Sequence, residues 1–569
     1  MNGGDGSQGL VLNGAQSGDN LGFSVALGDV NGDGRADLLA GAAQYGTANG
    51  AAVLVFGNSA VPMGPDGLEL QAIVNGQVPP DAAVAALFPQ GHSFFGRRVR
   101  FLGDLDGDGI GDLGINAVEE LNSTSQDFQG ETYIIYGGPN VGEILVDFTR
   151  LLPENGGDGR EGFVFTGGEG AGLSGLDFFG RFDINADNRN DLLITAGNEF
   201  EPGRGSGHIF VLYGRDGRPF PPRLTFADLI AMPPEEGFLI VPPVPESPFD
   251  PLASGIPNAR LINDINGDGL AEIIFCRRVS QFPGTSVNGE CYLIFGKPGA
   301  APFPSVFDTG RLLVRNGGDG SEGLVIIGSR QAECLGSSAI ASFREPDAVD
   351  GIGDFDRDGF NDLLIGGAGC SGNAAGRAYL FFGQADFPPE LDLRDPDFPG
   401  PGGPRVQTLL PVNDETTLFG FALGVGGVGD VNSDGFADIA IHNAQGVPTA
   451  LNGAWVVLGR PEPPALFHVA DLLPENGGDG QHGFLVLDPP DEESLGQAIA
   501  GGDFNGDGVS DMAFGGGAMD PGDRSNAGRV IVLFGRRAPV VAVPAFNFWS
   551  MALLVLCITI MGLFVYYHH

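Results

Sequence analysis

One nine-residue pattern recurs seven times along the chain and limits what the chain can fold into. At Asp503 it reads DFNGDGVSD, with acidic or amide side chains at positions 1, 3, 5 and 9 and a glycine at position 6. Such a turn directs three side-chain oxygens inward, and the carbonyl of position 7 with the carboxylate of position 9 completes a cage. Ca²⁺ prefers oxygen ligands at roughly 2.3 to 2.6 Å, whereas Mg²⁺ keeps its waters and demands a tighter octahedron. The pattern therefore predicts up to seven calcium sites.

A single copy would be weak support, because Asp, Asn and Gly also form ordinary turns. Seven copies with oxygens at the same four positions favour metal binding over plain turns. In the third copy Asn188 replaces the glycine, and Asn is the next best residue for a left-handed backbone. The predicted ligands, with position 7 contributing its carbonyl, are Asp29, Asn31, Asp33, Arg35, Asp37; Asp104, Asp106, Asp108, Ile110, Asp112; Asp183, Asn185, Asp187, Arg189, Asp191; Asp264, Asn266, Asp268, Leu270, Glu272; Asp354, Asp356, Asp358, Phe360, Asp362; Asp430, Asn432, Asp434, Phe436, Asp438; and Asp503, Asn505, Asp507, Val509, Asp511.

Apolar strands flank every loop. A Gly-containing apolar stretch such as Phe95-Gly96 or Phe179-Gly180 precedes the loops, and a continuous apolar run such as residues 38–42 follows them. Short apolar runs between Gly and Asp are typical of buried strands, so each loop would join a hairpin. A third strand ending in glycine follows, and a fourth is visible in several units, as at Gly162. Four strands in seven units spaced 73 to 90 residues apart predict an all-β, seven-bladed β-propeller of four-stranded blades.

The predicted propeller spans residues 2–537. Its last unit lacks a fourth strand, and residues 9–13 match that strand, so the N-terminal strand should close the ring. The motif NGGDG at Asn2, Asn155, Asn316 and Asn476 falls at about every second unit. This spacing favours duplication of a two-blade piece, and the alternative is a turn preferred before an outer strand.

The Phe-Gly stretch, the acidic loop and the Gly/Ala-rich strand together resemble the FG-GAP repeats of integrin α N-terminal propellers and related bacterial surface proteins. The resemblance covers about residues 2–537, although unit four has residues 259–262, ARLI, where Phe-Gly is expected. It implies calcium in loops that join the two inner strands on one face. It also implies a surface-displayed adhesion or ligand-binding module, whose unknown protein or carbohydrate ligand binds the opposite face. The connections at residues 76–92, 242–257 and 277–289 are expected on that face.

A short linker, residues 538–545, leads into residues 546–567, which carry no charge and are long enough to span a bilayer. The stretch VPAFNFWSM at Val543 resembles bacterial C-terminal sorting signals that begin Ile/Val-Pro-Thr-Leu; a simple membrane anchor is the alternative. Either predicts an exported protein at the cell surface or outer envelope, membrane-anchored or processed. Copies of the repeat continue upstream of the position of Met1, so we expect the native start to lie further upstream.

Four cysteines fall as two local pairs, Cys276 with Cys291 and Cys334 with Cys370. Each pair is placed to face across neighbouring strands, which predicts two disulfides and an oxidising compartment, with free buried thiols as the alternative.

The net charge of −43 argues against nucleic acid as a partner. No HExxH, GxSxG or phosphate-binding glycine loop is present, so we predict no enzymatic activity. Two alternatives stay open. One is a polysaccharide- or lipid-active extracellular enzyme, which would need a charged cluster in the central channel of the propeller. The other is a passive surface structural protein without a ligand.

Overall fold

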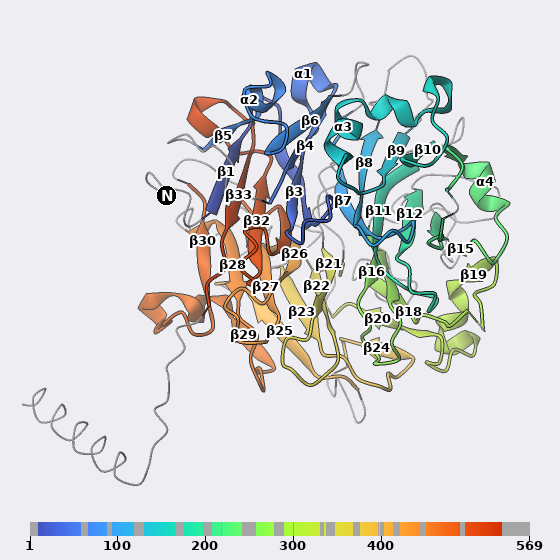
Figure 1. The fold of residues 1–569 in the computed structure, drawn as a ribbon. Coiled ribbons are helices and arrows are strands. Elements are labelled where there is room, and N and C mark those ends of the chain that lie inside the picture. Colours follow the sequence, from blue (N-terminus) through green and yellow to red (C-terminus); the bar gives the residue numbers. More distant parts are fainter. Residues whose placement is uncertain are drawn as a thin grey trace, which may run out of the picture.

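The computed structural model describes residues 9–57, 67–87, 94–118, 130–166, 174–196, 208–217, 219–241, 258–277, 289–299, 301–329, 335–336, 348–367, 376–395, 398, 403–412, 421–443, 451–489 and 495–537. Seven β-sheets follow one another in chain order around a ring (Figure 1). The predicted seven-bladed β-propeller is therefore confirmed.

Each blade is built on four antiparallel strands. From the innermost strand outward they are β2 Leu21–Gly28, β3 Asp37–Ala42, β4 Ala51–Val55 and β6 Ala83–Leu87 in blade 1; β7 Val99–Gly103, β8 Asp112–Val118, β9 Gly130–Ile135 and β10 Gly162–Thr166 in blade 2; β11 Ser174–Phe182, β12 Asp191–Ala196, β13 His208–Leu212 and β15 Gly237–Val241 in blade 3; β16 Asn258–Ile262, β17 Glu272–Arg277, β18 Glu290–Ile294 and β20 Gly323–Ile327 in blade 4; β21 Val349–Gly353, β22 Asp362–Gly367, β23 Arg377–Phe381 and β25 Val406–Leu410 in blade 5; β26 Phe421–Gly429, β27 Asp438–Asn443, β28 Gly453–Val457 and β30 Gly483–Leu487 in blade 6; and β31 Ala498–Gly502, β32 Asp511–Gly516, β33 Arg529–Leu533 and β1 Gly9–Asn13 in blade 7.

The first and last strands of the described chain share one sheet. β1 pairs antiparallel with β33, with Leu10 opposite Val532 and Leu12 opposite Val530. The Asn13 Oδ1 accepts a hydrogen bond of 2.8 Å from Arg529 Nε. This pairing completes blade 7 and closes the ring, and a propeller of this kind leaves only short, protected strand edges.

Five blades carry a short fifth strand at the outer edge. These strands are β5 Leu68–Glu69, β14 Arg223–Thr225, β19 Val306–Asp308, β24 Glu390–Asp392 and β29 Leu466–His468. Each lies between the third and fourth strands of one blade and pairs in parallel with the outer strand of the preceding blade. On blade 1 the helix α3, Val141–Val146, packs against β6 instead. Strands of two or three residues carry no recognisable sequence pattern, so this strand pairing between neighbouring blades was not predicted.

Short helical turns lie in the connections between strands. They are the α-helices α1 Tyr45–Ala48, α2 Leu70–Val74 and α4 Phe226–Ile230, and the 3₁₀ turns η1 Phe148–Leu151, η2 Pro153–Asn155, η3 Thr309–Leu312, η4 Val314–Asn316, η6 Val469–Leu472, η7 Pro474–Asn476 and η8 Pro521–Asp523. Two of them, α1 and η8, lie between the second and third strands of their blades, and the others lie between the third and fourth strands.

One sequence assignment is wrong. Residues 83–87 form the fourth strand of blade 1, β6, and not part of a connection on the opposite face. The pattern AVAAL was missed because alanine is a weak strand signal. Phe179-Gly180 precedes the third loop on the inner strand β11, as predicted. Phe179 pairs with Leu193, which is the register of Ala26 with Leu39 in blade 1. The pair therefore lies deep in the inner strand, where it lines the central channel.

The predicted disulfide between Cys276 and Cys291 is present. The two residues lie directly opposite each other on β17 and β18, and both are fully buried. Cys334 and Cys370 lie outside the described residues.

The predicted linker and spanning helix at residues 538–567 also lie outside the described part of the chain. Within that part, no helix combines the length and the apolar character that crossing a bilayer requires.

His442 in β27 should make stability depend on pH. It is fully buried, and burial lowers its pKa to about 4. An unfolded histidine has a pKa near 6.5, so folding favours the neutral ring. The stabilisation is complete above pH 6.5 and is lost as pH falls toward 4, by about 3 kcal/mol. Denaturant unfolding at several pH values should show this loss as a growing difference between the parent and His442→Leu, because all other titrating groups are common to the two proteins. Parallel curves for the two proteins would show that His442 does not titrate in this way.

Candidate metal centre

Each of the seven acidic loops joins the two innermost strands of a blade. The backbone is left-handed at positions 4 and 6 of every loop, with φ between 59° and 97°. Asn188 occupies position 6 of the third loop at φ 63°, as its substitution for glycine predicts. Position 4 was not recognised from the sequence, because Ala186, Arg357 and Ser433 replace glycine there in three copies.

The carboxylate at position 1 organises each loop. In the first copy, Asp29 Oδ1 accepts hydrogen bonds from the amides of Gly32 and Asp33, at 2.8 and 3.2 Å, and Oδ2 accepts one from Gly34 at 2.7 Å. The bond from position 6 to position 1 recurs in all seven loops at 2.7 to 3.0 Å. The side-chain oxygens are therefore held in place by the loop's own backbone.

The carboxyl group at position 9 is buried and connects the loop to the rest of the blade. One oxygen accepts from the amide of position 2 in all seven loops, at 2.7 to 3.1 Å. The other accepts, in six loops, from the glycine that ends the third strand, at 2.8 to 2.9 Å. The sequence predicts position 9 only as a ligand, and the structure gives it this second, structural role.

Burial raises the pKa of these position 9 carboxyl groups, and the neighbouring carboxylates at positions 1 and 5 raise it further. The pKa is raised to about 7 for Asp37, Asp362 and Asp438. For Asp511 it is raised to about 6, by burial and then by Asp503. The pKa values of Asp112, Asp191 and Glu272 are also well above their ordinary range, for the same reasons. Nearby positive charge, such as a divalent cation, would favour the ionised form of each of these groups.

Three loops bring three carboxylates together with their oxygens within 4.8 Å of one another. The groups are Asp104, Asp106 and Asp108; Asp264, Asp268 and Glu272; and Asp354, Asp356 and Asp362. All the donors are hard oxygens, which suits Ca²⁺ and gives no reason to expect a soft transition metal. The residues that would hold the ion are those at positions 1, 3, 5 and 9, with the carbonyl of position 7.

Two loops also hold an arginine against a predicted ligand. Arg405 forms an ion pair with Asp356 in the fifth loop, and Arg189 lies 3.6 Å from Asp187 in the third. A bound cation would compete with these guanidinium groups, so we expect these two loops to bind metal more weakly than the others.

Hydrogen bonds join the seven loops into a closed ring on one face of the propeller. The amide of position 8 in each loop donates to the carbonyl of position 1 in the preceding loop, at 2.8 to 3.3 Å. The bond from Ala36 to the carbonyl of Asp503 completes the ring between blades 1 and 7. An ion bound in one loop would therefore also support the position of its neighbour.

The left-handed alanine at position 4 of the third loop offers a test of this backbone geometry. Ala186 is exposed and has φ 65°, a conformation that costs alanine about 1 to 2 kcal/mol. Ala186→Gly should therefore raise the free energy of unfolding by about 0.5 to 1 kcal/mol after the added chain entropy is subtracted. Ala231 is equally exposed but right-handed, with φ −84°. Ala231→Gly is the matched control and should lower that free energy in the same denaturant titration. Destabilisation by both substitutions would contradict the assigned strain.

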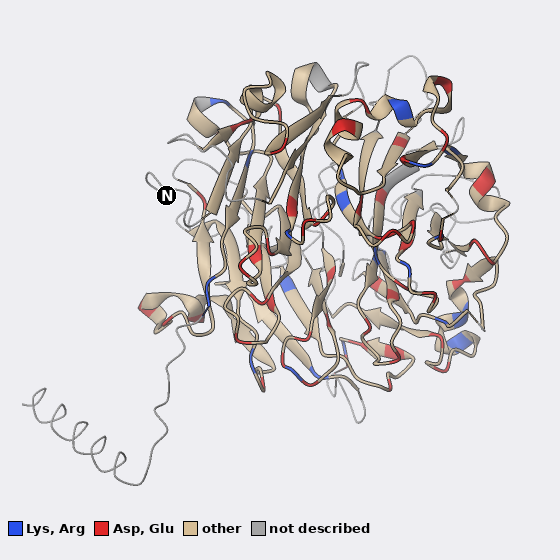
Figure 2. Cartoon of the chain, in the orientation of Figure 1, with Lys and Arg blue, Asp and Glu red and all other residues tan. Residues whose placement is uncertain are grey.

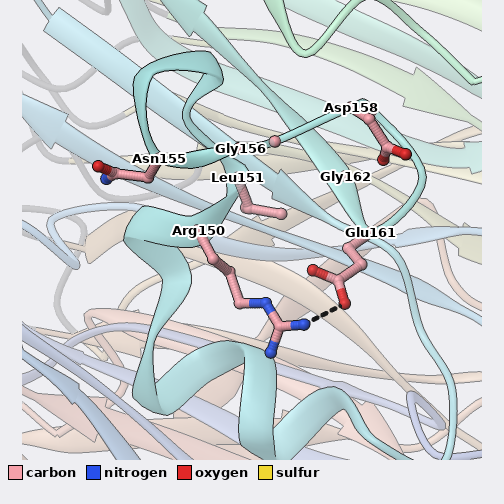
Figure 3. Close-up of a pocket in the computed structure, with 9 residues that line it drawn as sticks. Arg150, Leu151, Asn155, Gly156, Asp158, Glu161 and Gly162 are labelled. Atoms are coloured by element: carbon pink, nitrogen blue, oxygen red, sulfur yellow. Dashed lines mark hydrogen bonds and ion pairs between the residues drawn. The ribbon is translucent and has the colours of Figure 1, made fainter.

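The NGGDG motif is a structural turn in its three described copies. Asn155, Asn316 and Asn476 each donate from Nδ2 to a backbone carbonyl six residues earlier, at 2.7 to 2.9 Å. The glycine that follows each Asn is left-handed and closes a 3₁₀ turn before the outer strand. In blade 2 the motif lines a shallow pocket of about 220 Å³ beside the ion pair of Arg150 and Glu161 (Figure 3). The motif therefore forms a turn before the outer strands of blades 2, 4 and 6, and the duplication of a two-blade piece stays a prediction.

Comparisons with known proteins agree with this architecture. Residues 21–56 match the FG-GAP repeat family, and this stretch spans β2, the first acidic loop, β3 and β4. Integrin alpha-3 from Cricetulus griseus is 29% identical over 221 residues, and integrin alpha-3 from Mus musculus is 30% identical over 221 residues. Each match covers 37% of this chain and 17% of the relative, so the chain spans only a small part of these relatives. The chain is thus an integrin α-like, FG-GAP-containing seven-bladed propeller with acidic groups that could hold metal ions.

Proposed function

We propose that the chain is a calcium-stabilised, extracellular propeller, displayed at the cell surface, that binds a protein or carbohydrate through the face opposite the acidic loops. The observation that carries this proposal is the closed ring of seven hydrogen-bonded loops on one face. Seven cations in this ring would make that face rigid and give it a structural role. The connections of the opposite face are then free to vary, and loops on a rigid scaffold are where binding usually resides.

Three further observations support the proposal. The distant similarity is to integrin α subunits, the family that the repeat pattern itself resembles. The disulfide between Cys276 and Cys291 is consistent with an oxidising, extracellular compartment. Acidic residues outnumber basic ones by 72 to 29, and Figure 2 shows few basic residues around the ring. That negative charge disfavours the binding of a polyanionic macromolecule across the surface.

The test is a ligand screen with the full chain in 1 mM calcium, against a glycan array and a panel of extracellular proteins. We expect retention of a specific ligand and its release by a calcium chelator. Glycans that are retained are then incubated with the chain and examined for cleavage products. Cleavage would support the polysaccharide-active alternative, and failure to retain any ligand would support a passive structural protein; either result would overturn the proposal.

The proposed membrane attachment through residues 546–567 is tested separately. Cell fractionation should find the full chain in the envelope fraction and a chain ending at residue 537 released from it. Release of both forms would contradict anchoring by this segment.

A further inference from the structure

The seven inner strands enclose a central channel. Its cavity of about 390 Å³ is lined by residues from β2, β7, β11, β16, β21, β26 and β31. Small-molecule sites usually measure about 300 to 1,000 Å³, so the channel has room for a ligand of the size of one sugar.

Arginines gather on one side of this channel, where blades 2, 3 and 4 meet. Arg100, Arg181 and Arg260 line the cavity. Arg98 lies directly before β7, two residues before Arg100. The guanidinium groups of Arg98, Arg100 and Arg260 lie 3.7, 3.5 and 3.4 Å from the carboxylate of Asp177. The guanidinium carbons of Arg260 and Arg100 also lie 3.4 and 4.6 Å from the ring centre of Phe179.

The charge of this cluster is positive in a chain that is otherwise strongly acidic. Among the described residues in or against the channel, four arginines face two carboxylates, Asp177 and Asp350. Asp177 is shared by three guanidinium groups, and all four of these residues are less than 10% exposed. Like charges held together out of water repel one another strongly, so such clusters are unfavourable unless an anion joins them.

The backbone at Arg181 carries a second, independent sign of function. A register shift between Phe179 and Phe182 inserts an extra residue into β11, and Arg181 adopts a left-handed φ of 85° there. Similar shifts occur in blades 2, 5 and 6, but the left-handed residue there is a glycine, Gly103, Gly353 or Gly429. Two residues before each acidic loop, where Arg181 stands in blade 3, these blades have the buried apolar residues Leu102, Ile352 and Val428. Arg181 instead is exposed and lines the channel. Bulges redirect side chains, and strained non-glycine residues cluster at functional sites.

We propose that the central channel binds a small carboxylate anion of about the size of a monosaccharide, with Arg181 as its principal contact. A guanidinium group can donate two parallel hydrogen bonds to a carboxylate, which gives both affinity and orientation. Arg100 and Arg260 supply further positive charge beside it, and Asp177 and Phe179 hold these two side chains in place. The site borders the acidic loops, since Ser510 of the seventh loop lines the cavity. It is distinct from the face assigned to ligand binding in the proposed function.

The experiment is isothermal titration of the full chain with sodium glucuronate and with glucose, in matched buffers containing 1 mM calcium. We expect saturable binding of glucuronate and none of glucose, because the two differ by the carboxylate. Arg181→Leu, which places in blade 3 the residue type found at Leu102, should weaken glucuronate binding by roughly 10- to 100-fold, as the loss of a charged hydrogen-bonded pair predicts. The matched control is Arg150→Leu, which removes an exposed arginine at the outer edge of blade 2 and should leave affinity unchanged.

Three results would overturn the proposal: no glucuronate binding by the parent chain, glucose binding of equal strength, or unchanged affinity in Arg181→Leu. Circular dichroism and thermal melting of both variants establish that they fold. The channel and the opposite face are different surfaces. Absence of glucuronate binding would therefore not contradict the proposed function, and a ligand screen without a hit would not contradict the channel site.

Discussion

Excess chelator should lower the melting temperature of the full chain by about 10 to 20 °C, if calcium occupies most of the seven loops. A ligand present at 100 times its dissociation constant stabilises the folded state by about 2.7 kcal/mol for each site. Without the cation, three or four carboxylates in each loop repel one another. The decrease in melting temperature should be large because the stabilisation of each site adds up over the seven loops.

Scanning calorimetry in 1 mM calcium and in excess chelator measures this shift. Returning calcium should restore the original melting temperature, whereas magnesium should restore less of it, since Mg²⁺ requires a tighter octahedral shell. Chloride salts of equal ionic strength control for general screening of the acidic surface. A melting temperature that is the same with calcium and with chelator would show that the loops act as ordinary turns.

The hydrogen bonds between loops add a further expectation to the same measurement. Each loop donates from position 8 to position 1 of its predecessor. Loss of one ion therefore loosens a neighbouring loop as well as its own. Partial titration with chelator should lower the melting temperature of one transition progressively, and should not produce seven independent ones.

The fold was predictable because its signals are local and repeated. The spacing of loops such as 503–511 is enough to predict their hairpins, and the strand GLVL at residues 9–12 matches the strand missing from blade 7. The fifth strands were not predictable, since β5 and β14 are two and three residues long and pair with a different blade. Their pairing depends on the ring geometry, which no single repeat contains.

The candidate metal ligands could be named from the sequence, but their second role could not. Position 9 accepts a hydrogen bond from a glycine 20 or more residues away, such as Gly57 for Asp37. The arginine cluster of the channel could not be predicted from the sequence either. Asp177 and Arg260 are 83 residues apart in sequence and meet only because blades 3 and 4 are neighbours.

The buried position 9 carboxyl should be the most sensitive single position in each loop, and Asp438 in blade 6 provides the test. Its two oxygens accept from the amides of Val431 and Gly459 at 2.9 and 2.8 Å, and the residue is fully buried. Asp438→Ala leaves both amides without these acceptors, at a cost of about 1 to 3 kcal/mol each. We therefore expect a loss of about 2 to 6 kcal/mol, measured by denaturant unfolding in excess chelator so that metal affinity does not contribute.

The matched control is Asp434→Ala, at the exposed position 5 of the same loop. Its carboxylate accepts hydrogen bonds from the Phe436 amide at 3.0 Å and from Asn432 Nδ2 at 2.9 Å. In chelator it should change the free energy of unfolding by less than about 1 kcal/mol, because it also removes a repelling charge. In 1 mM calcium it should become clearly destabilising, since a ligand is lost. Asp438→Ala, in contrast, should destabilise under both conditions. If the two variants behaved alike in chelator, position 9 would act only as a metal ligand, and the connection it makes between the loop and the third strand would contribute little to stability.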